Sequence, residues 1–152
     1  MRTTFDPPTD AGAYRFCHRL RVRFAETDAM GVVHHAAYLP YLEEARVEYL
    51  RSVGHPFDRI RADGYELPVA GVAARYLRPL AFDEVVDVHL AVATTIGASF
   101  EFGYLLTVDD EPRATAVTRH GVVGPRGRPV RCPSWLVALS SDPSTGAGVP
   151  PG

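Results

Sequence analysis

Arg23–Tyr38 (RFAETDAMGVVHHAAY) separates an alternating, strand-like segment from the longest helical pattern in the chain. Eleven of these residues, Asp28 to Tyr38, include a carboxylate, a glycine, two histidines and the expected helix start. The first turn of a helix has unpaired backbone N–H groups and a partial positive charge, so it binds anions and developing oxyanions. An aspartate just upstream could attack a carbonyl that those amides polarise, or activate water to attack it. The pattern therefore indicates a site for acyl transfer or hydrolysis.

These residues also have an ordinary structural interpretation. Thr27-Asp28 and Met30-Gly31 are pairs typical of loops, so Asp28 could serve only as a turn residue. A single histidine is more often a structural or surface residue than a ligand or a catalyst. The residues alone leave both interpretations open.

The segment before this stretch predicts a half-buried strand over 16–24. Its apolar side chains alternate with arginines, and a period of two is typical of a strand with one buried face. The expected inner face comprises Phe16, His18, Leu20, Val22 and Phe24. For the outer row of Arg19, Arg21 and Arg23, a solvated or interface face is a better explanation than a phosphate-binding stripe.

A helix is predicted over 39–53, where apolar residues recur at spacings of three and four. Pro40 is tolerated in the first turn, and Gly54 ends the helix. At roughly 1.5 Å per residue, this helix is more than about 20 Å long. It therefore needs a broad apolar surface, such as a sheet, to lie on.

Strands dominate the rest of the chain. After a short helical turn or loop at 57–64, strands are predicted over 67–77, 86–92, 100–108 and 113–123, and a short helix over 134–139. Short turns join the last three strands, which predicts an antiparallel meander. The order of strand, long helix and four strands indicates an α+β fold in which an antiparallel sheet wraps one helix.

Composition and charge limit the possible functions. The chain of 152 residues fits one domain, predicted over 14–139, and its net charge of −2 gives no reason to expect nucleic acid binding. No apolar run suits a membrane span or a signal peptide, so we expect a cytoplasmic protein. Cys17 and Cys132 lack the spacing of a metal site, and two reduced thiols are expected. The ends, 1–13 and 140–152, are predicted to be disordered tails.

Several motifs follow one another in a specific order. They are ETDAMGVV at 26–33, His35, Tyr38, EEAR at 43–46, Tyr76-x-x-Pro79 followed by Asp83, and Arg128-Pro129 followed by Pro133. In this order, the chain resembles the hot-dog-fold acyl-CoA thioesterases of the 4-hydroxybenzoyl-CoA thioesterase type. Within that family it is most similar to the branch associated with Tol–Pal systems. The resemblance covers roughly residues 18–139.

The resemblance implies a hot-dog fold, in which a curved antiparallel sheet wraps a central helix. It also implies homodimers that join their sheets edge to edge, often paired again into homotetramers. Active sites then form at the dimer interface, where CoA or phosphopantetheine enters. No metal or redox cofactor is implied.

The resemblance also implies roles for single residues. Asp28 matches the catalytic carboxylate, acting as a nucleophile or a general base. His35 matches the position seven residues later, where a histidine or a backbone N–H polarises the thioester carbonyl. Gly31, Val33 and Tyr38 belong to the same motif and are expected to bind substrate.

Three positions qualify this match. Phe24 stands where the Tol–Pal-like branch tends to have a tyrosine, so a hydroxyl donor is missing. His34 replaces a more usual apolar or aromatic residue. Glu43 matches a recurrent glutamate, for which a structural role at the helix surface is at least as well supported as a catalytic role.

Arginines provide a further hypothesis about binding. Arg75 and Arg78, with Arg126, Arg128 and Arg131 in a later segment rich in proline and glycine, could contact the CoA phosphates. An idle, solvated surface is the alternative, because exposed charges often contribute little.

The predicted function is hydrolysis of an acyl-CoA or acyl-pantetheine thioester to a free acid and a thiol. One alternative is a thioesterase acting on a polyketide or fatty acyl chain bound to an acyl carrier protein. Another is a non-catalytic protein that binds acyl thioesters. A hot-dog dehydratase or hydratase is disfavoured by the spacing of Asp28 and His35.

Overall fold

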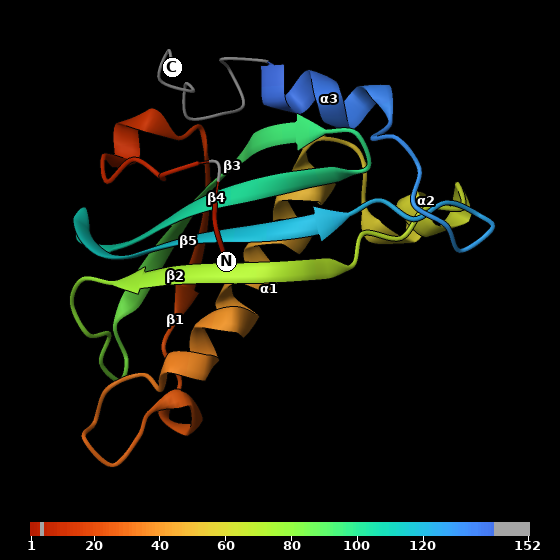
Figure 1. The fold of residues 1–152 in the computed structure, drawn as a ribbon. Coiled ribbons are helices and arrows are strands. Elements are labelled where there is room, and N and C mark those ends of the chain that lie inside the picture. The colour runs from red at the N-terminus through yellow and green to blue at the C-terminus, as the bar shows by residue number, and fades with distance from the viewer. Residues whose placement is uncertain (4, 142–152) are drawn as a thin grey trace.

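The computed structural model describes residues 1–3 and 5–141. Its strands are β1 (Phe16–Arg21), β2 (Val69–Tyr76), β3 (Val85–Ile96), β4 (Ser99–Val108) and β5 (Glu111–Gly121). Its helices are α1 (Tyr38–Ser52), α2 (Phe57–Ala62) and α3 (Ser134–Ser141), with the short 3₁₀ turns η1 (Ala11–Ala13), η2 (Phe24–Glu26) and η3 (His35–Ala37). The strands form one antiparallel sheet in the order β1-β3-β4-β5-β2, and α1 crosses one face of it (Figure 1). The predicted α+β layout is confirmed.

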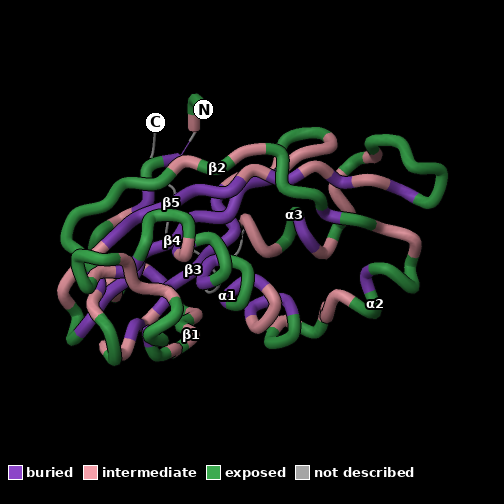
Figure 2. Tube along the Cα trace, turned by 90° about the horizontal axis from the view of Figure 1, so that it is seen from below, coloured by how far each residue is buried: buried purple, intermediate pink, exposed green. Residues whose placement is uncertain are grey.

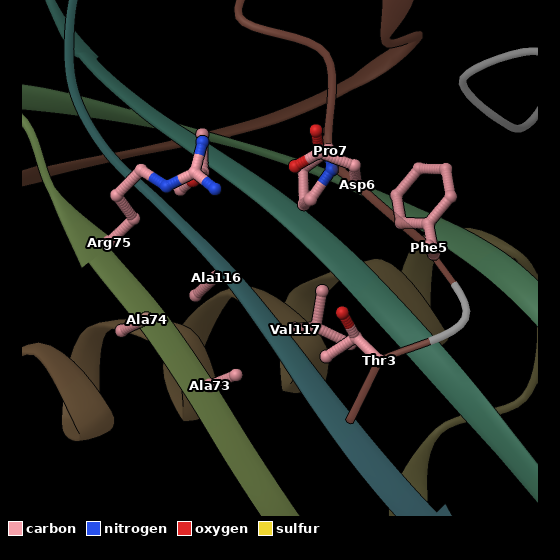
Figure 3. Close-up of a pocket in the computed structure, with 10 residues that line it drawn as sticks. Thr3, Phe5, Asp6, Pro7, Ala73, Ala74, Arg75, Ala116 and Val117 are labelled. Atoms are coloured by element: carbon pink, nitrogen blue, oxygen red, sulfur yellow. The ribbon is translucent and has the colours of Figure 1, made fainter. Parts of the chain in front are cut away.

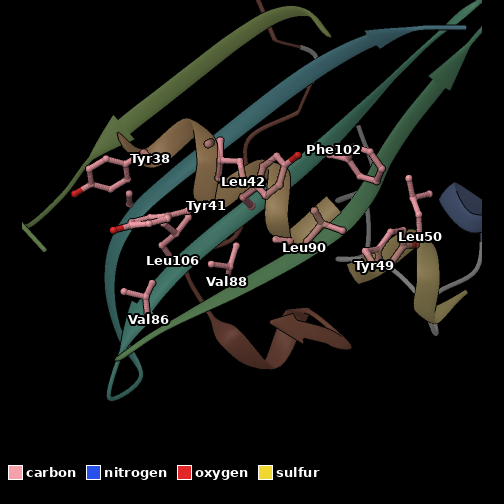
Figure 4. Packing of buried hydrophobic residues seen from close by; sticks show 14 of the residues in the cluster. Tyr38, Tyr41, Leu42, Tyr49, Leu50, Val86, Val88, Leu90, Phe102 and Leu106 are labelled. Carbon is pink, nitrogen blue, oxygen red and sulfur yellow. The ribbon is translucent and has the colours of Figure 1, made fainter. Parts of the chain in front are cut away.

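The main core lies between α1 and the inner face of the sheet. Tyr41, Leu42 and Tyr49 of α1 are buried against alternate side chains of β3 and β4 (Figure 4). The sheet side of this core includes Val86, Val88, Leu90, Phe102 and Leu106. Because these side chains alternate along their strands, one face of the sheet supplies the broad apolar surface that the helix needs.

The first strand is shorter than predicted. Beyond Arg21 the chain turns into η2, where the Glu26 carboxylate accepts the Arg23 backbone N–H at 2.7 Å and its guanidinium N–H at 2.8 Å. This turn breaks the alternation, so Phe24 is 76% exposed and lies edge-on to Phe82. The prediction that Phe24 belongs to the inner face is wrong.

The hairpin between β4 and β5 is also tighter than predicted. Asp109 and Asp110 alone form the turn, both with positive φ, and Val108 pairs with Glu111. Two residues with positive φ match the twist of the flanking strands, so the ladder continues to the turn. β5 therefore begins at Glu111.

The N-terminal segment differs from the predicted disordered tail. Phe5 is only 5% exposed and, with Tyr14, covers apolar residues on the outer face of the sheet. A Cβ added at Gly103 would overlap the Phe5 ring, so glycine makes room for it. Composition could not reveal this contact, because the partner lies in β4. Of the predicted C-terminal tail, residues 142–152 lie outside the described part of the chain, and Ser140 belongs to α3.

Burial differs sharply between the centre and the edge of the sheet. β3, β4 and β5 are mostly buried, whereas β2 is exposed along most of its length (Figure 2). Five apolar side chains on β2 or beside it are between 37 and 50% exposed: Leu39, Val69, Val72, Tyr76 and Leu77. An apolar edge strand favours association with another strand.

Candidate active site

A tight turn holds Asp28 in the loop between η2 and η3. The Asp28 N–H donates to the Val32 carbonyl at 2.8 Å, and the Gly31 N–H donates to the Asp28 carbonyl at 3.0 Å. Gly31 has a φ of 79°, which glycine adopts without strain. One carboxylate oxygen of Asp28 accepts the Met30 N–H at 2.8 Å. Asp28 thus has the turn role that its loop-like neighbours predict, and its half-buried carboxylate retains acceptor capacity for other chemistry.

His34 caps the helix start that follows. Its Nδ1 accepts the Ala36 N–H at 3.1 Å, and its carbonyl accepts the Ala37 N–H at 2.8 Å. For the His35 N–H, the described residues supply no hydrogen-bond acceptor. This amide can therefore donate a hydrogen bond to a bound molecule at the start of η3. The capping role of His34 is a structural function that the sequence interpretation missed.

His35 lines a hollow of about 530 Å³ between this helix start and the end of β2. The other residues around the hollow are Val33, Tyr38, Tyr76, Leu77, Arg78 and Pro79. Tyr76 donates its hydroxyl to the His35 carbonyl at 3.1 Å and lies edge-on to Tyr38. The hollow therefore brings together Val33, His35, Tyr38 and Arg78 from the predicted site.

Tyr76 is a lining residue that the sequence interpretation used only as part of a motif. Its spacing from Pro79 was the available signal, because both residues border the hollow. Arg78 forms an ion pair with Glu111 at 2.8 Å, so its guanidinium is held at the rim by β5.

The sequence matches a known protein family. The family model of the thioesterase-like superfamily matches residues 22–139. The chain belongs to this superfamily. In the part of the chain that the structure describes, no helix is long and apolar enough to cross a membrane.

Individual relatives agree with this assignment. The thioesterase superposes on the crystal structure of a protein from Aquifex aeolicus with a TM-score of 0.77 and 39% identity, covering 82% of this chain and 98% of that one. The 1,4-dihydroxy-2-naphthoyl-CoA hydrolase of Picosynechococcus is 30% identical over 120 residues, which are 74% of this chain and 82% of the relative. The acyl-CoA thioester hydrolase YbgC of Escherichia coli is 30% identical over 83 residues, 55% of this chain and 62% of the relative. The fold is therefore the hot-dog fold, and the protein is an enzyme of the thioesterase class.

The remaining predicted arginines lie elsewhere in the thioesterase protomer. Arg75 lies against the N-terminal segment on the outer face, in a hollow that it shares with Asp6 and Pro7 (Figure 3). Arg126 and Arg128 are exposed in the loop after β5, beside the beginning of β2. Tyr76 is at the other end of that strand, roughly 20 Å away at about 3.3 Å per residue. One protomer therefore does not bring Arg126 and Arg128 to His35, and Arg75, although next to Tyr76 in the chain, lines the hollow on the other face of the sheet.

A second hollow, of about 650 Å³, lies between α1 and β2. It is lined by Leu39, Pro40, Glu43, Arg46, Val69, Val72 and Thr118. Most of these side chains are apolar, and Arg46 is the buried cation among them. Glu43 lies at the exposed surface of α1 beside this hollow, which gives the recurrent glutamate a place near a cavity.

Among the described residues, no group of three or more His, Cys, Asp or Glu side chains is placed to hold a metal ion. Cys17 and Cys132 are free thiols.

Proposed function

We propose that this thioesterase hydrolyses acyl-CoA, with Asp28 and the His35 N–H as its catalytic groups. The observation that carries the proposal is the helix start at His35. Its backbone N–H has no acceptor among the described residues, His35 lines a hollow, and the helix start follows the turn that holds Asp28. A thioester carbonyl is already activated, so one carboxylate and an amide donor suffice. The names of the relatives from Picosynechococcus and E. coli support CoA thioesters as substrates.

The reaction has one bond to form and one to break. The thioester oxygen accepts the His35 N–H, and Asp28 takes a proton from the water that attacks the carbonyl carbon. The C–S bond then breaks, and the proton passes to the departing thiolate. Direct attack by Asp28, followed by hydrolysis of the resulting anhydride, gives the same acid and thiol.

The exposed imidazole of His35 supplies a second donor in this proposal. Its ring lies 4.1 Å from that of His34, between centroids, at the entrance of the capped helix. Phe24 provides no hydroxyl, so the proposal assigns the additional side-chain donor to His35. The motifs at 26–33 and 43–46 support a place near the Tol–Pal-associated branch.

The complete site also needs a second copy of the chain. β2 is an apolar edge strand, so it can pair with β2 of a second copy. When a twofold axis relates the two copies, their β2 strands run antiparallel. The beginning of one β2 then lies beside the end of the other. This pairing carries the partner's Arg126 and Arg128 toward the hollow of His35, where they suit the phosphates of CoA.

The test is a panel of acyl-CoA substrates of different chain lengths, with free thiol release measured by a colorimetric reagent. We expect turnover of at least one acyl-CoA by a protein that light scattering shows to be a dimer or tetramer. The same acyl groups on an acyl carrier protein separate the two substrate classes. Failure to release thiol from any acyl-CoA would remove the proposal.

A further inference from the structure

A buried polar chain runs from α1 across the inner face of the sheet to the segment before β2. Arg46 donates to the Tyr104 hydroxyl at 3.2 Å, and that hydroxyl is 2.8 Å from the Thr118 hydroxyl. The Thr118 hydroxyl is 2.8 Å from His120 Nε2, and His120 Nδ1 is 3.1 Å from the Leu67 carbonyl. Each polar group after Arg46 thus has partners on both sides, which is what burial requires.

Arg46 itself is much less satisfied. Arg46 is only 7% exposed. Its guanidinium has five N–H donors. The structure gives it one hydrogen bond, to Tyr104, and no carboxylate within ion-pair distance among the described residues. None of its nitrogens is a fully buried atom without a partner, so the nitrogens that Tyr104 does not bind retain accessible surface. Arg46 also lines the hollow between α1 and β2, so its remaining donors are available to a molecule bound there.

Nothing in the rest of the network can serve as a counter-ion. Burial lowers the pKa of His120 to about 4, so the imidazole is neutral near pH 7. Burial raises the pKa of Tyr104, so its hydroxyl also stays neutral. The hollow therefore combines apolar walls with the Arg46 guanidinium and, at the exposed surface of α1, the Glu43 carboxylate.

We propose that Arg46 selects acyl groups that carry an oxygen atom at the end far from the thioester. This inference rests on the proposed function, in which the thioester carbonyl lies at His35. Eleven residues separate His35 from Arg46, about 16 Å along a helix at about 1.5 Å per residue. The arginine side chain leans toward the helix start, which shortens the distance between its guanidinium and a thioester carbonyl at His35. The remaining distance still places the guanidinium at the far end of an acyl chain. The walls formed by Leu39, Val69 and Val72 hold the apolar stem.

The substrates for the test share one chain length. They are octanoyl-CoA, 8-hydroxyoctanoyl-CoA and octanedioyl-CoA, so the terminal group is methyl, hydroxyl or carboxylate. A hydrogen bond to a charged group discriminates by about tenfold or more. We expect kcat/KM of the wild-type enzyme to be at least about tenfold higher for one oxygenated substrate than for octanoyl-CoA. Preference for the diacid identifies an anionic ligand, and preference for the hydroxy acid a neutral one.

Arg46→Met removes the charge and keeps an unbranched side chain. We expect the ratio of kcat/KM values, oxygenated to plain, to fall to about one. Arg51→Met is the matched control, because Arg51 lies on the same helix, is exposed and pairs with Glu48. Its ratio should equal that of the wild type. A merely structural role for Arg46 would change melting temperature or overall rate without changing this ratio.

Two results overturn the inference while leaving the proposed function intact. One is equal kcat/KM of the wild type for all three substrates, which needs no variant and is independent of folding defects. The other is an unchanged ratio in a folded Arg46→Met protein. If no acyl-CoA is hydrolysed, titration calorimetry with octanoate, 8-hydroxyoctanoate and octanedioate decides instead. Equal or absent binding of the three acids then counts against Arg46 as a selector.

Discussion

Asp28 combines a structural role in the turn with its proposed chemical role. Its side chain accepts the Met30 N–H, and an asparagine oxygen can do the same. Asp28→Asn should therefore keep the turn and the melting temperature while removing the basicity. We expect kcat to fall by roughly 10²–10⁴, with little change in substrate affinity.

The measurement is steady-state thiol release beside thermal melting of both proteins. Asp110→Asn is the matched control, because Asp110 is an exposed turn residue with positive φ, which asparagine also accepts. Near-wild-type turnover in a folded Asp28→Asn protein would exclude Asp28 from the mechanism.

His35 offers both an amide and an imidazole, and His35→Ala separates them. The backbone N–H remains in the variant, because His34 still caps the helix start. We expect kcat to fall by about tenfold to a hundredfold with KM little changed, since a donor acting on the oxyanion affects mainly the transition state. Unchanged kcat would assign the whole effect to the amide. His18→Ala, on β1 beside Glu44, is the control for loss of a histidine.

His120 makes stability depend on pH. Its pKa, lowered to about 4 by burial, lies below the value of about 6.5 in the unfolded chain. Between these values the unfolded chain binds more protons, so the stabilisation is present above about pH 6.5 and is lost as the pH falls toward 4. We expect the free energy of unfolding to decrease by about 3 kcal/mol over this range from this group.

Urea denaturation at a series of pH values measures this effect. His120→Gln should flatten the dependence between about pH 6.5 and 4. Parallel curves for wild type and His120→Gln would show that His120 is not the group responsible.

At the scale of elements, local sequence patterns predicted the helices and strands well. They did not predict contacts between residues that are distant in the sequence. The spacing of Leu42, Ala45 and Tyr49 shows the buried stripe of α1, because a helix repeats its faces within a few residues. Phe24 is exposed because Glu26 caps Arg23, a contact that alternation does not encode. Arg46 lies four residues after Leu42, so an arginine on the apolar stripe was the available sign of the buried network.

The N-terminal segment is the element least accessible to sequence reasoning. Phe5 and Gly103 are in contact although they are far apart in the sequence. We expect Phe5→Ala to lower the free energy of unfolding by about 1.5–3 kcal/mol, the worth of burying a phenylalanine side chain. Gly103→Ala should displace the segment and make residues 1–13 more sensitive to protease.

A double-mutant cycle tests the contact itself. Once Phe5 is alanine, Gly103→Ala should add little further destabilisation, because the ring that it displaces is absent. Gly121→Ala is the control, since a Cβ there makes only ordinary contact with Pro68. Additive effects of Phe5→Ala and Gly103→Ala would mean that the two residues act independently.

At the scale of the whole molecule, the two edges of the sheet have different chemistry. β1 carries exposed arginines, of which Arg19 and Arg21 pair with Asp87 and Asp83. Charged side chains discourage pairing between strand edges, whereas the apolar β2 invites it. The molecule therefore has one edge suited to a second copy, and this edge adjoins both hollows.

A dimer built on β2 makes a prediction about mixed proteins. Asp28 and His35 belong to one protomer, whereas the phosphate-binding arginines of the same site come from the partner in the proposed dimer. Arg126→Ala with Arg128→Ala should raise KM for acyl-CoA and spare a short pantetheine thioester, which lacks the nucleotide phosphates. Mixing this double variant with Asp28→Asn then creates heterodimers in which one site carries both defects and the other carries none. Random exchange should restore about a quarter of wild-type activity at low acyl-CoA concentration, because half of the dimers are mixed and each has one intact site.

The control is a mixture of Asp28→Asn with His35→Ala. Both defects then lie in the catalytic groups of their own protomer, so every site of the mixed dimer is damaged and activity should stay low. Recovery in the first mixture and not in the second requires that the arginines act across the interface. If neither mixture recovers activity although light scattering and a tag-exchange assay show that subunits have mixed, the arginines do not cross the dimer axis. The phosphate-binding role of the loop after β5 would then have to be abandoned, because within one protomer that loop lies at the wrong end of β2.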